Sequence, residues 1–519
     1  MQRSAAALTT ALVLLTLASG AHAAGSGGGL WTSAGQDLGN TRHQSSESKI
    51  TPTTVGSMQL KWTFTTAGDV SATPAVDSST VYFPDWKGNL YAVDRRTGQQ
   101  VWKASIPTAS GIPNDKARAT PVVSGNKVII GTQGPFGGGG KMLAFDRNTG
   151  ALLWSTQVES HIAAIITQSA IVFDNRVYVG TSSQEEALAA QGVSGGLYPC
   201  CSFRGSVAAL DLESGAILWK TYMVPQGYTG GAVWGSTPAV DPRRGQLYVA
   251  TGNNYSIPPA AQACVAAAGG DPSVTQQCIA PDDHFDSVVA LDLRTGAIRW
   301  ATRALPFDAW TVDCIPFIGD GDNCPEPAGP DYDFGQGPAL FPVGKGKEFL
   351  GAGQKSGQYW ALDPATGEVR WVTQAGPGGT AGGLQWGSAV DGKRVYTANA
   401  NSNSRQWTLP SGSTVTWGMW SGLDAETGQL LWQTAAPDFG GTSGPVTTTN
   451  GVVFGCSLDA LGHMYALDGA TGAILWSFIS GGSCLSGAAI SGGDVYWGSG
   501  YSNFGFGTPN NKVYAFTVR

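Results

Sequence analysis

Two adjacent cysteines, Cys200 and Cys201 in the stretch GGLYPCCSFRGSV, are the least ordinary reactive residues of this sequence. Consecutive Cα atoms lie about 3.8 Å apart across a trans peptide bond, whereas disulfides usually join Cα atoms roughly 4.4–6.8 Å apart. A bond between these neighbours would close a small, flat, strained ring that restrains almost no chain. The sequence leaves two alternatives: the cysteines are not bonded to each other, or the ring itself is the useful surface.

The N-terminus predicts an export route on which disulfides form. Residues 1–23 contain one Arg, then an apolar run, then Ala-His-Ala, which is the pattern of a signal peptide cleaved after Ala23. The run is too short for a membrane anchor, and no later stretch is long and apolar enough to be one. We expect a periplasmic or secreted protein, although an ordinary N-terminal helix is the alternative. Eight cysteines form an even set, as export permits.

The composition indicates many short strands rather than several helical domains. The chain has 519 residues, a formal net charge of −7 and no basic tract, which argues against nucleic acid as a partner. Charged residues make up 13%, about half the usual share, while there are 74 glycines and 18 tryptophans. Tight turns between strands account for such a composition.

One pattern recurs seven times along the chain. An apolar strand ends in Asp, a Thr/Ser-Gly turn follows, and Trp stands eight residues after the Asp. This is hairpin chemistry, because Asp caps the bend and Gly accepts the positive φ. The Asp–Trp pairs are Asp94–Trp102, Asp146–Trp154, Asp211–Trp219, Asp292–Trp300, Asp363–Trp371, Asp424–Trp432 and Asp468–Trp476.

The two ends of the chain supply an eighth copy in halves. LKWTF around Trp62 has the outer strand without the turn, and KVYAFTV at residues 512–518 has the inner strand with nothing after it. Joining the halves closes a ring and removes its exposed sheet edges. We therefore predict an all-β fold, an eight-bladed β-propeller over residues 24–519 closed by the N- and C-terminal strands. An open solenoid is the alternative that the complementary ends disfavour.

Long insertions between the middle repeats carry most of the cysteines. They fall at residues 184–203, 254–285 and 306–336, and long loops on a rigid scaffold are where binding sites are often built. Proximity in sequence favours the pairs Cys264–Cys278, Cys314–Cys324 and Cys456–Cys484, which leaves Cys200 with Cys201. Eight cysteines allow many other pairings, so this is a preference among them.

The repeat together with the adjacent cysteines resembles the quinoprotein (PQQ-dependent) alcohol dehydrogenases, most of all their polyvinyl alcohol dehydrogenase branch. The stretches SSQEE, YPCCSFRGSVAALD, FDAWTVDC, GPDYDFG, GQKSGQYWALD and VYWGSGYSN carry the likeness over nearly the whole mature chain. The resemblance implies an oxidoreductase that converts alcohols, secondary alcohols or polyvinyl alcohol among them, to ketones or aldehydes. It also implies pyrroloquinoline quinone (PQQ) and Ca²⁺ as cofactors, with a lanthanide as the alternative metal.

The resemblance also implies where the quinone lies. A disulfide between Cys200 and Cys201 would be a plate on one face of the planar cofactor, and Trp234 would cover the other face. Trp234 does not occupy the Trp position of the repeat, although a role in packing between blades is the alternative. For the metal, Glu185 and Asn253 match the family's ligands, with Glu186 as a neighbouring candidate. Oxygen ligands of this kind suit calcium.

The catalytic base departs from the family pattern. Related enzymes often carry Asp-x-Trp-Asp, whereas this chain reads Asp308-Ala-Trp310-Thr311-Val-Asp313. A threonine hydroxyl cannot accept a proton from an alcohol at neutral pH. In an extended strand Asp313 would project to the same side as Thr311. We therefore expect Asp313 to be the base and a metal ligand, with Asp308 as the second candidate.

Three cations complete the implied site. Lys355 matches the family residue that stabilises negative charge on the reduced quinone, with a surface lysine in a turn as the alternative. Arg204 and Arg118 are candidates for the cofactor's carboxylates, because guanidinium groups pair well with them. Arg204 is preferred because it is three residues from the cysteines.

Other cofactors and function classes receive less support. No C-x-x-C-H motif for haem is present, so electrons are expected to pass to a separate acceptor such as a cytochrome c. The glycine run PFGGGGK lies inside a β repeat rather than opening a helix, which argues against a dinucleotide site. The rival hypothesis is a cofactor-free propeller that serves as a binding scaffold. A hydrolase has no nucleophile motif to support it.

Overall fold

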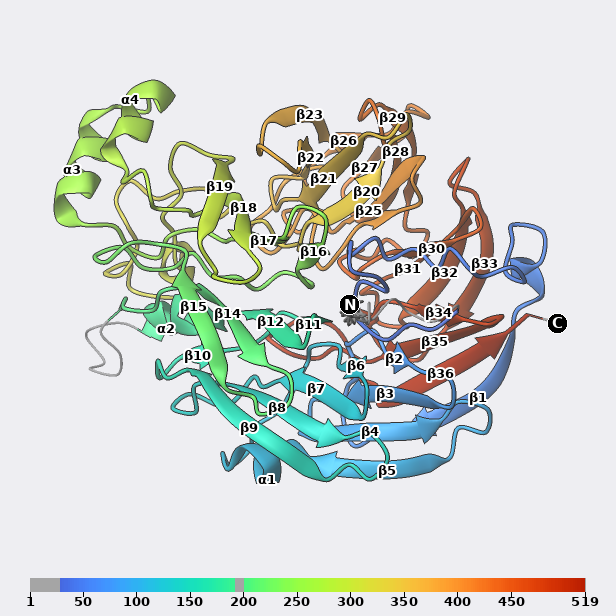
Figure 1. Ribbon diagram of the computed structural model, residues 1–519. Helices are drawn as coiled ribbons and strands as arrows, with labels where there is room; N and C mark the ends of the chain where they lie inside the picture. Colours follow the sequence, from blue (N-terminus) through green and yellow to red (C-terminus); the bar gives the residue numbers. More distant parts are fainter. Residues whose placement is uncertain (1–28, 192–199, 519) are drawn as a thin grey trace, which may run out of the picture.

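The computed structural model describes residues 29–191 and 200–518 and forms a ring of eight four-stranded antiparallel sheets (Figure 1). The predicted eight-bladed β-propeller is confirmed. The predicted signal peptide, residues 1–23, lies outside the described residues. Within the described part, none of the helices has the length and apolar character needed to cross a bilayer.

Each blade consists of four strands, which follow one another from the innermost to the outermost. The blades are β2 (Ala75–Val76), β3 (Thr80–Pro84), β4 (Asn89–Asp94), β5 (Gln100–Ser105); β6 (Val122–Ser124), β7 (Lys127–Gly131), β8 (Gly140–Asp146), β9 (Leu152–Glu159); β11 (Ile171–Phe173), β12 (Arg176–Gly180), β14 (Ser206–Asp211), β15 (Ile217–Tyr222); β16 (Ala239–Asp241), β17 (Gln246–Ala250), β18 (Ser287–Asp292), β19 (Ile298–Arg303); β20 (Ala339–Pro342), β21 (Glu348–Gly353), β22 (Gln358–Leu362), β23 (Val369–Gln374); β24 (Ala389–Val390), β25 (Arg394–Asn399), β28 (Met419–Asp424), β29 (Leu430–Ala435); β30 (Thr447–Thr449), β31 (Val452–Cys456), β32 (His463–Asp468), β33 (Ile474–Ile479); and β34 (Ala489–Ser491), β35 (Asp494–Ser499), β36 (Lys512–Thr517), β1 (Gln59–Thr65).

The last of these blades closes the ring as predicted. β1, from the N-terminal part of the chain, pairs antiparallel with the C-terminal strand β36, and Gln59 lies opposite Thr517. The indole of Trp476 in the preceding blade donates to Met58 O at 3.2 Å. Trp62 of the closing blade donates in turn to Arg95 O of the next blade at 3.0 Å. The ring is therefore continuous through its closure.

The repeat owes its fixed spacing to contacts between neighbouring blades. Asp94 accepts hydrogen bonds from the Arg96 and Thr97 amides, and Gly98 follows with φ of 74°. A Cβ on Gly98 would lie 2.8 Å from the ring of Trp62 in the adjacent blade. The Trp of one blade thus lies flat on the glycine turn of the next.

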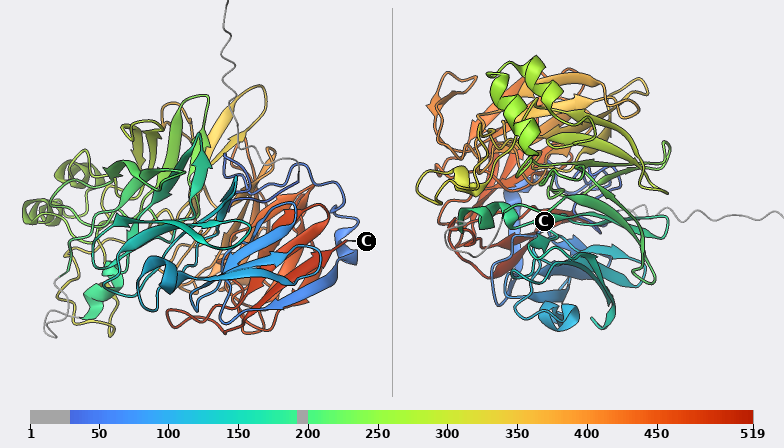
Figure 2. Two further views of the ribbon diagram at one scale, coloured as in Figure 1. Left: turned by 60° about the horizontal axis from the view of Figure 1, so that its bottom comes forward. Right: turned by 90° about the vertical axis from the view of Figure 1, so that its left-hand side faces the viewer.

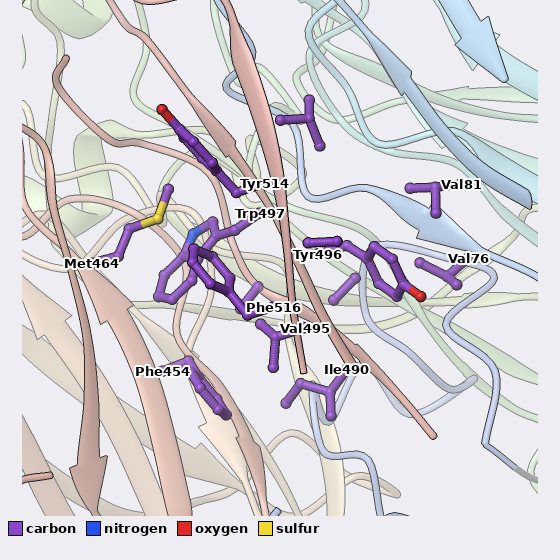
Figure 3. Close-up of a cluster of buried hydrophobic side chains, with 14 of the residues drawn as sticks. Val76, Val81, Phe454, Met464, Ile490, Val495, Tyr496, Trp497, Tyr514 and Phe516 are labelled. Atoms are coloured by element: carbon purple, nitrogen blue, oxygen red, sulfur yellow. The ribbon is translucent and has the colours of Figure 1, made fainter. Parts of the chain in front are cut away.

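Apolar side chains fill the space between blades. The largest buried cluster spans the closing blade and both of its neighbours, and its members include Val76, Phe454, Trp497 and Phe516 (Figure 3). Burial of such side chains is the main stabilising contribution to the fold. Because the two chain ends share this cluster, the core also holds the ring closed.

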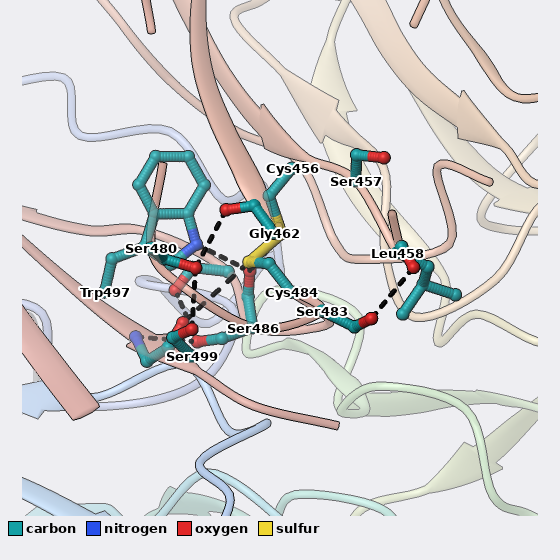
Figure 4. Close-up of a disulfide and its surroundings, with 12 residues drawn as sticks. Cys456, Ser457, Leu458, Gly462, Ser480, Ser483, Cys484, Ser486, Trp497 and Ser499 are labelled. Carbon is teal, nitrogen blue, oxygen red and sulfur yellow. Dashed lines mark hydrogen bonds between the residues drawn. A yellow bond between two sulfur atoms is a disulfide. The ribbon is translucent and has the colours of Figure 1, made fainter. Parts of the chain in front are cut away.

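All four predicted disulfides are confirmed: Cys200–Cys201, Cys264–Cys278, Cys314–Cys324 and Cys456–Cys484. The last joins the end of β31 to the segment before β34 and so connects two blades (Figure 4). The other three lie in or beside the long insertions.

The insertions contain most of the helices, and α2, α3 and α4 gather on one side of the ring (Figures 1 and 2). The α-helices are α1 (Ile106–Ser110), α2 (Glu185–Leu188), α3 (Pro259–Ala267) and α4 (Pro272–Cys278), and the 3-10 helices are η1 (Val55–Ser57), η2 (Ala189–Gln191) and η3 (Val312–Cys314). Two short hairpins pair β10 (Ala164–Ile165) with β13 (Ser182–Ser183) and β26 (Trp407–Thr408) with β27 (Thr414–Val415).

A segment near the N-terminus winds through the middle of the ring. Inner-strand amides of several blades donate to its carbonyls, as Val123 N does to Thr32 O and Thr448 N to Arg42 O, at 2.8 and 2.9 Å. Asn40 donates from its side chain to Thr237 O. The segment is thereby hydrogen-bonded to inner strands of several blades around the middle of the ring.

Candidate functional site

A cavity of about 250 Å³ lies among the loops that precede the inner strands. Four of the residues predicted from sequence line it: Trp234, Lys355, Arg118 and Glu186, the neighbouring candidate for the metal. The other predicted residues do not form its wall, but several of them contact residues that do.

Trp234 forms an aromatic wall of the cavity together with Trp386. The two rings meet edge to face, with centroids 5.1 Å apart. The Trp234 indole donates to Asp333 Oδ2 at 2.8 Å, which fixes the orientation of the ring. A rigid aromatic face of this kind suits a planar ligand.

The Cys200–Cys201 disulfide lies next to this wall rather than in it. Cys201 packs in the same small cluster as Trp234, around the buried side chains of Phe203 and Tyr255. Tyr255 also lines the cavity. The disulfide is therefore not part of the cavity lining, but it packs in a cluster that includes two lining residues, Trp234 and Tyr255.

Glu185 and Glu186 point to different places. Glu185 is fully buried and accepts from the amides of Ser202 and Phe203 at 2.6 and 2.7 Å. It thus holds the chain that follows the disulfide. Glu186 lines the cavity, and its Oε1 has no hydrogen-bond partner in the described part of the chain. The structure favours Glu186 over Glu185, the first choice from sequence, as the glutamate available to a ligand.

Lys355 is held between two aspartates that the sequence analysis did not single out. Its ammonium lies 2.7 Å from Asp331 Oδ1 and 3.2 Å from Asp333 Oδ2, and the residue is 6% exposed. Burial alone would lower the pKa of Lys355, but Asp331 and Asp333 raise it above its ordinary value. The lysine is thus a fixed positive charge at the cavity, and a surface position is excluded.

Asp333 connects the predicted site residues to one another. Its Oδ1 accepts from Asn253 N at 2.7 Å, and its Oδ2 accepts from Trp234 Nε1 and pairs with Lys355. Asp333 also lines the cavity. Asn253 is buried and uses Nδ2 to donate to Asn254 O and Trp310 O, both at 2.9 Å. Its Oδ1 is thus the atom left for a ligand.

Buried acidic side chains outnumber the cations in the region behind the cavity wall. Burial raises the pKa of Glu186 to about 8 and that of Asp308 to about 6. Burial and the neighbouring Asp308 raise the pKa of Asp286 well above its ordinary value. Both carboxylate oxygens of Asp286 are buried with no hydrogen-bond partner among the described residues. With Asp331 and Asp333, five carboxyl groups lie near one lysine.

Asp313 does not lie where the sequence analysis placed it. The prediction that residues 311–313 are extended is wrong, because Val312–Cys314 form the 3-10 helix η3. The Asp313 carboxylate accepts from Gly321 N and Asn323 N at 3.1 and 2.7 Å. Asp313 therefore orders its own disulfide-linked loop. Asp308 accepts from the amides of Asp331 and Tyr332 and so positions the loop that carries Asp333.

The two candidate arginines have different surroundings, and only one of them lines the cavity. Arg204 donates to Val224 O at 3.0 and 2.6 Å and stacks on Tyr222, so its guanidinium serves a structural role. Arg118 lines the cavity and stacks on Trp386, 4.1 Å from the ring centroid. The structure favours Arg118 over Arg204 as the partner of an anionic ligand.

The residues present fit a planar, acidic cofactor beside a divalent cation. The cavity supplies an aromatic wall and a cation at Arg118 for a carboxylate. The excess of buried carboxyl groups, with orphaned oxygens on Glu186 and Asp286, is what a bound cation would satisfy.

Comparisons with known proteins agree with the fold and with the family resemblance. The family model PQQ_2, described as "Outer membrane protein assembly factor BamB", matches residues 20–302 and 355–519. A polyvinylalcohol dehydrogenase of Sphingopyxis sp. (strain 113P3) is 31% identical over 89% of this chain and 72% of its own length. A polyvinylalcohol dehydrogenase of a Pseudomonas species is 28% identical over 94% of this chain and 77% of its own length. The crystal structure of quinohemoprotein alcohol dehydrogenase from Comamonas testosteroni superposes with a TM-score of 0.69 and 19% identity, covering 95% of this chain and 81% of that one.

Proposed function

The chain belongs to the quinoprotein alcohol dehydrogenase family, and from this membership we propose that it oxidises an alcohol to a ketone or aldehyde with bound PQQ and a divalent metal ion. The contact that carries the proposal is Asp333, which touches Trp234, Asn253 and Lys355 and also lines the cavity. One residue thus links the expected aromatic wall, metal ligand and cation. A binding scaffold without a cofactor would not require so many buried charged side chains at one cavity.

The cofactor would be held by Trp234 against one face and by Arg118 at a carboxylate. When bound, PQQ supplies a carbonyl that accepts hydride, and the metal supplies Lewis acidity. Glu186 and Asn253 would hold the metal through their side-chain oxygens, with Asp308 and Asp286 adding negative charge behind them. Calcium is the proposed ion, and a lanthanide is the alternative with the same preference for oxygen ligands. Cys200–Cys201 would support Tyr255 at the wall.

The proton of the substrate hydroxyl would pass to Asp333. The family's usual aspartate is absent at Thr311, and Asp313 is engaged within its own loop. A carboxylate offers about four acceptor positions, and three donors occupy Asp333: Asn253 N, Trp234 Nε1 and Lys355 Nζ. One position remains for the hydroxyl. A general base must be within hydrogen-bonding reach of the proton it takes, which a residue on the cavity wall satisfies.

Lys355 would act on both the base and the cofactor. Its ammonium lies 3.2 Å from Asp333 Oδ2 and so would orient the carboxylate that accepts the proton. At the cavity wall the same ammonium would stabilise negative charge that develops during hydride transfer. Asp331, 2.7 Å from the ammonium, keeps it in this position.

Secondary alcohols, polyvinyl alcohol among them, are the proposed substrates, and a separate carrier such as a cytochrome c is the proposed electron acceptor.

The proposed location is the periplasm or the exterior of the cell, after cleavage of the signal peptide behind Ala23. N-terminal sequencing of the exported protein would give Ala24 as the first residue. Export with residues 1–23 retained would contradict the signal peptide.

Reconstitution with PQQ and Ca²⁺, followed by a dye-linked assay on primary, secondary and polymeric alcohols, tests the proposal. We expect retained quinone absorbance and metal-dependent turnover. Arg118→Leu should lower PQQ affinity by about 10-fold or more, the loss of one charged contact, whereas Arg204→Leu should bind PQQ normally if it folds. Failure of the parent protein to retain PQQ would instead support a cofactor-free scaffold.

A further inference from the structure

A second, smaller cavity lies on the axis of the propeller, behind Trp386. Its volume is about 40 Å³, and its lining includes Arg42, Arg118 and the hydroxyl-bearing residues Thr120 and Ser169. Trp386 and Arg118 also line the larger cavity, so the two cavities are neighbours. No carboxylate is among the lining residues in the described part of the chain.

Arg42 is the unusual member of this lining. It is only 2% exposed, and neither Nε nor Nη1 has a hydrogen-bond partner among the described residues. Its backbone is fixed, since Arg42 N donates to Gly35 O and Thr448 N donates to Arg42 O, both at 2.9 Å. Gly387 admits the guanidinium, because a Cβ there would collide with Nε. The fold therefore holds an unpaired guanidinium on the axis.

Arg118 contributes a second cation to the same cavity. Its guanidinium lies over the rings of Trp386 and Tyr501, at 4.1 and 5.8 Å from their centroids. Burial lowers the pKa of Arg118, with only Tyr501 opposing, and no carboxylate contributes. Both arginines thus face one small space without an acidic partner.

Two such charges need compensation. Burial lowers the pKa of Arg42 to about 10, so this side chain is still protonated at neutral pH. An unpaired buried charge costs several kcal/mol in a folded protein. Water satisfies the hydrogen-bonding groups of a guanidinium but does not neutralise its charge. An anion does both.

We propose that this axial cavity binds a small inorganic anion between Arg42 and Arg118, with chloride as the ion to be tested. The cavity has room for a small ion, since about 10–15 Å³ on the same measure is enough to hold one water molecule. Ser169 adds a donor, because its Oγ accepts from Thr120 N and donates to no other described residue. The site does not depend on the proposed function and would be filled in the cofactor-free protein.

The first test is a crystal of the unliganded protein grown in sodium bromide. The expected result is a bromide anomalous peak in the axial cavity, within hydrogen-bonding distance of Arg42. The second test is the melting temperature at constant ionic strength, with gluconate replaced by chloride. For a dissociation constant of about 1 mM, raising chloride from about 1 to about 100 mM should raise Tm by about 2 °C.

Variants of Arg42 test whether both the bromide peak and the chloride-dependent change in Tm depend on this side chain. Arg42→Met should lose the bromide peak and the chloride-dependent shift, whereas Arg405→Met, at an exposed position, should keep both. Should Arg42→Met fail to fold, Arg42→Lys retains the charge without the planar fork and should need about 10-fold more chloride for the same shift. A parent protein with no bromide peak and an unchanged Tm would overturn the proposal.

Discussion

Replacing Asp333 with Asn removes the proposed base while changing the shape of the site little. The side chain stays the same size, and one oxygen remains to accept from Asn253 N, now 2.7 Å from Oδ1. The opposite atom becomes an amide nitrogen, which faces the donors Trp234 Nε1 and Lys355 Nζ. Lys355 keeps its pairing with Asp331. The substitution thus separates proton transfer from the architecture of the cavity.

Two effects of this substitution differ in size and in the quantity they change. One buried donor left without an acceptor costs about 1–3 kcal/mol, which would weaken PQQ binding. Loss of a general base reduces the chemical step by about 10²–10⁴-fold, which corresponds to about 2.7–5.5 kcal/mol of activation free energy. Measured at saturating PQQ, the turnover number reports the second effect alone. We expect kcat to fall at least about 10²-fold.

The assay is dye-linked turnover with the cofactor and the metal both saturating, checked by quinone absorbance. Asp313→Asn is the matched control, since it is the same chemical change at a carboxylate that binds only its own loop. It should retain kcat within about two-fold and lower the melting temperature instead, because a buried donor loses its partner. If Asp333→Asn keeps a tenth or more of the parent turnover, or Asp313→Asn loses as much, the assignment of the base is wrong.

Two further substitutions test the metal site and the packing between blades. Glu186→Gln should raise the Ca²⁺ concentration for half-maximal activity by about 10-fold or more, which is the cost of losing one charged ligand. The control Glu185→Gln should leave the Ca²⁺ dependence unchanged. A shift in the control alone would mean that Glu185 is the ligand. Gly98→Ala should destabilise the protein by about 1–3 kcal/mol more than Gly111→Ala. Both glycines have similar positive φ values, but a Cβ meets the Trp62 ring only at Gly98; equal losses in thermal unfolding would show that backbone conformation alone sets the cost.

The propeller could be predicted because its determinants are local and repeated. Asp94 and Gly98 shape the turn, and the Trp of the neighbouring blade packs on that turn. The fixed spacing between the Asp and the Trp of each repeat therefore determines both the length of the strand and the contact between blades. The split copy at the chain ends predicted the pairing of β1 with β36 for the same reason. Three of the disulfides followed from short separations within the insertions or between adjacent strands.

The site was harder to predict, because local conformation decides where adjacent side chains point. Glu185 and Glu186 are adjacent candidates in the sequence, but helix α2 begins at Glu185, and neighbouring side chains of a helix diverge by about 100°. Glu186 therefore lines the cavity and Glu185 does not. Asp313 was misplaced for a similar reason, since a turn of 3-10 helix replaces the expected strand.

The contacts of Asp331 and Asp333 with Lys355 could not be predicted from the spacing of residues in the sequence. Their partner Lys355 lies more than 20 residues away, in a strand-to-strand turn, and the contact arises only when the insertion folds back over the ring. A signal was present, since GPDYDFG carries two aspartates one residue apart within the same insertion as Thr311. A buried lysine such as Lys355 requires an acid nearby in space. The insertion brings Asp331 and Asp333 to 2.7 and 3.2 Å from the Lys355 ammonium, and this contact depends on how residues 306–336 fold rather than on any local spacing.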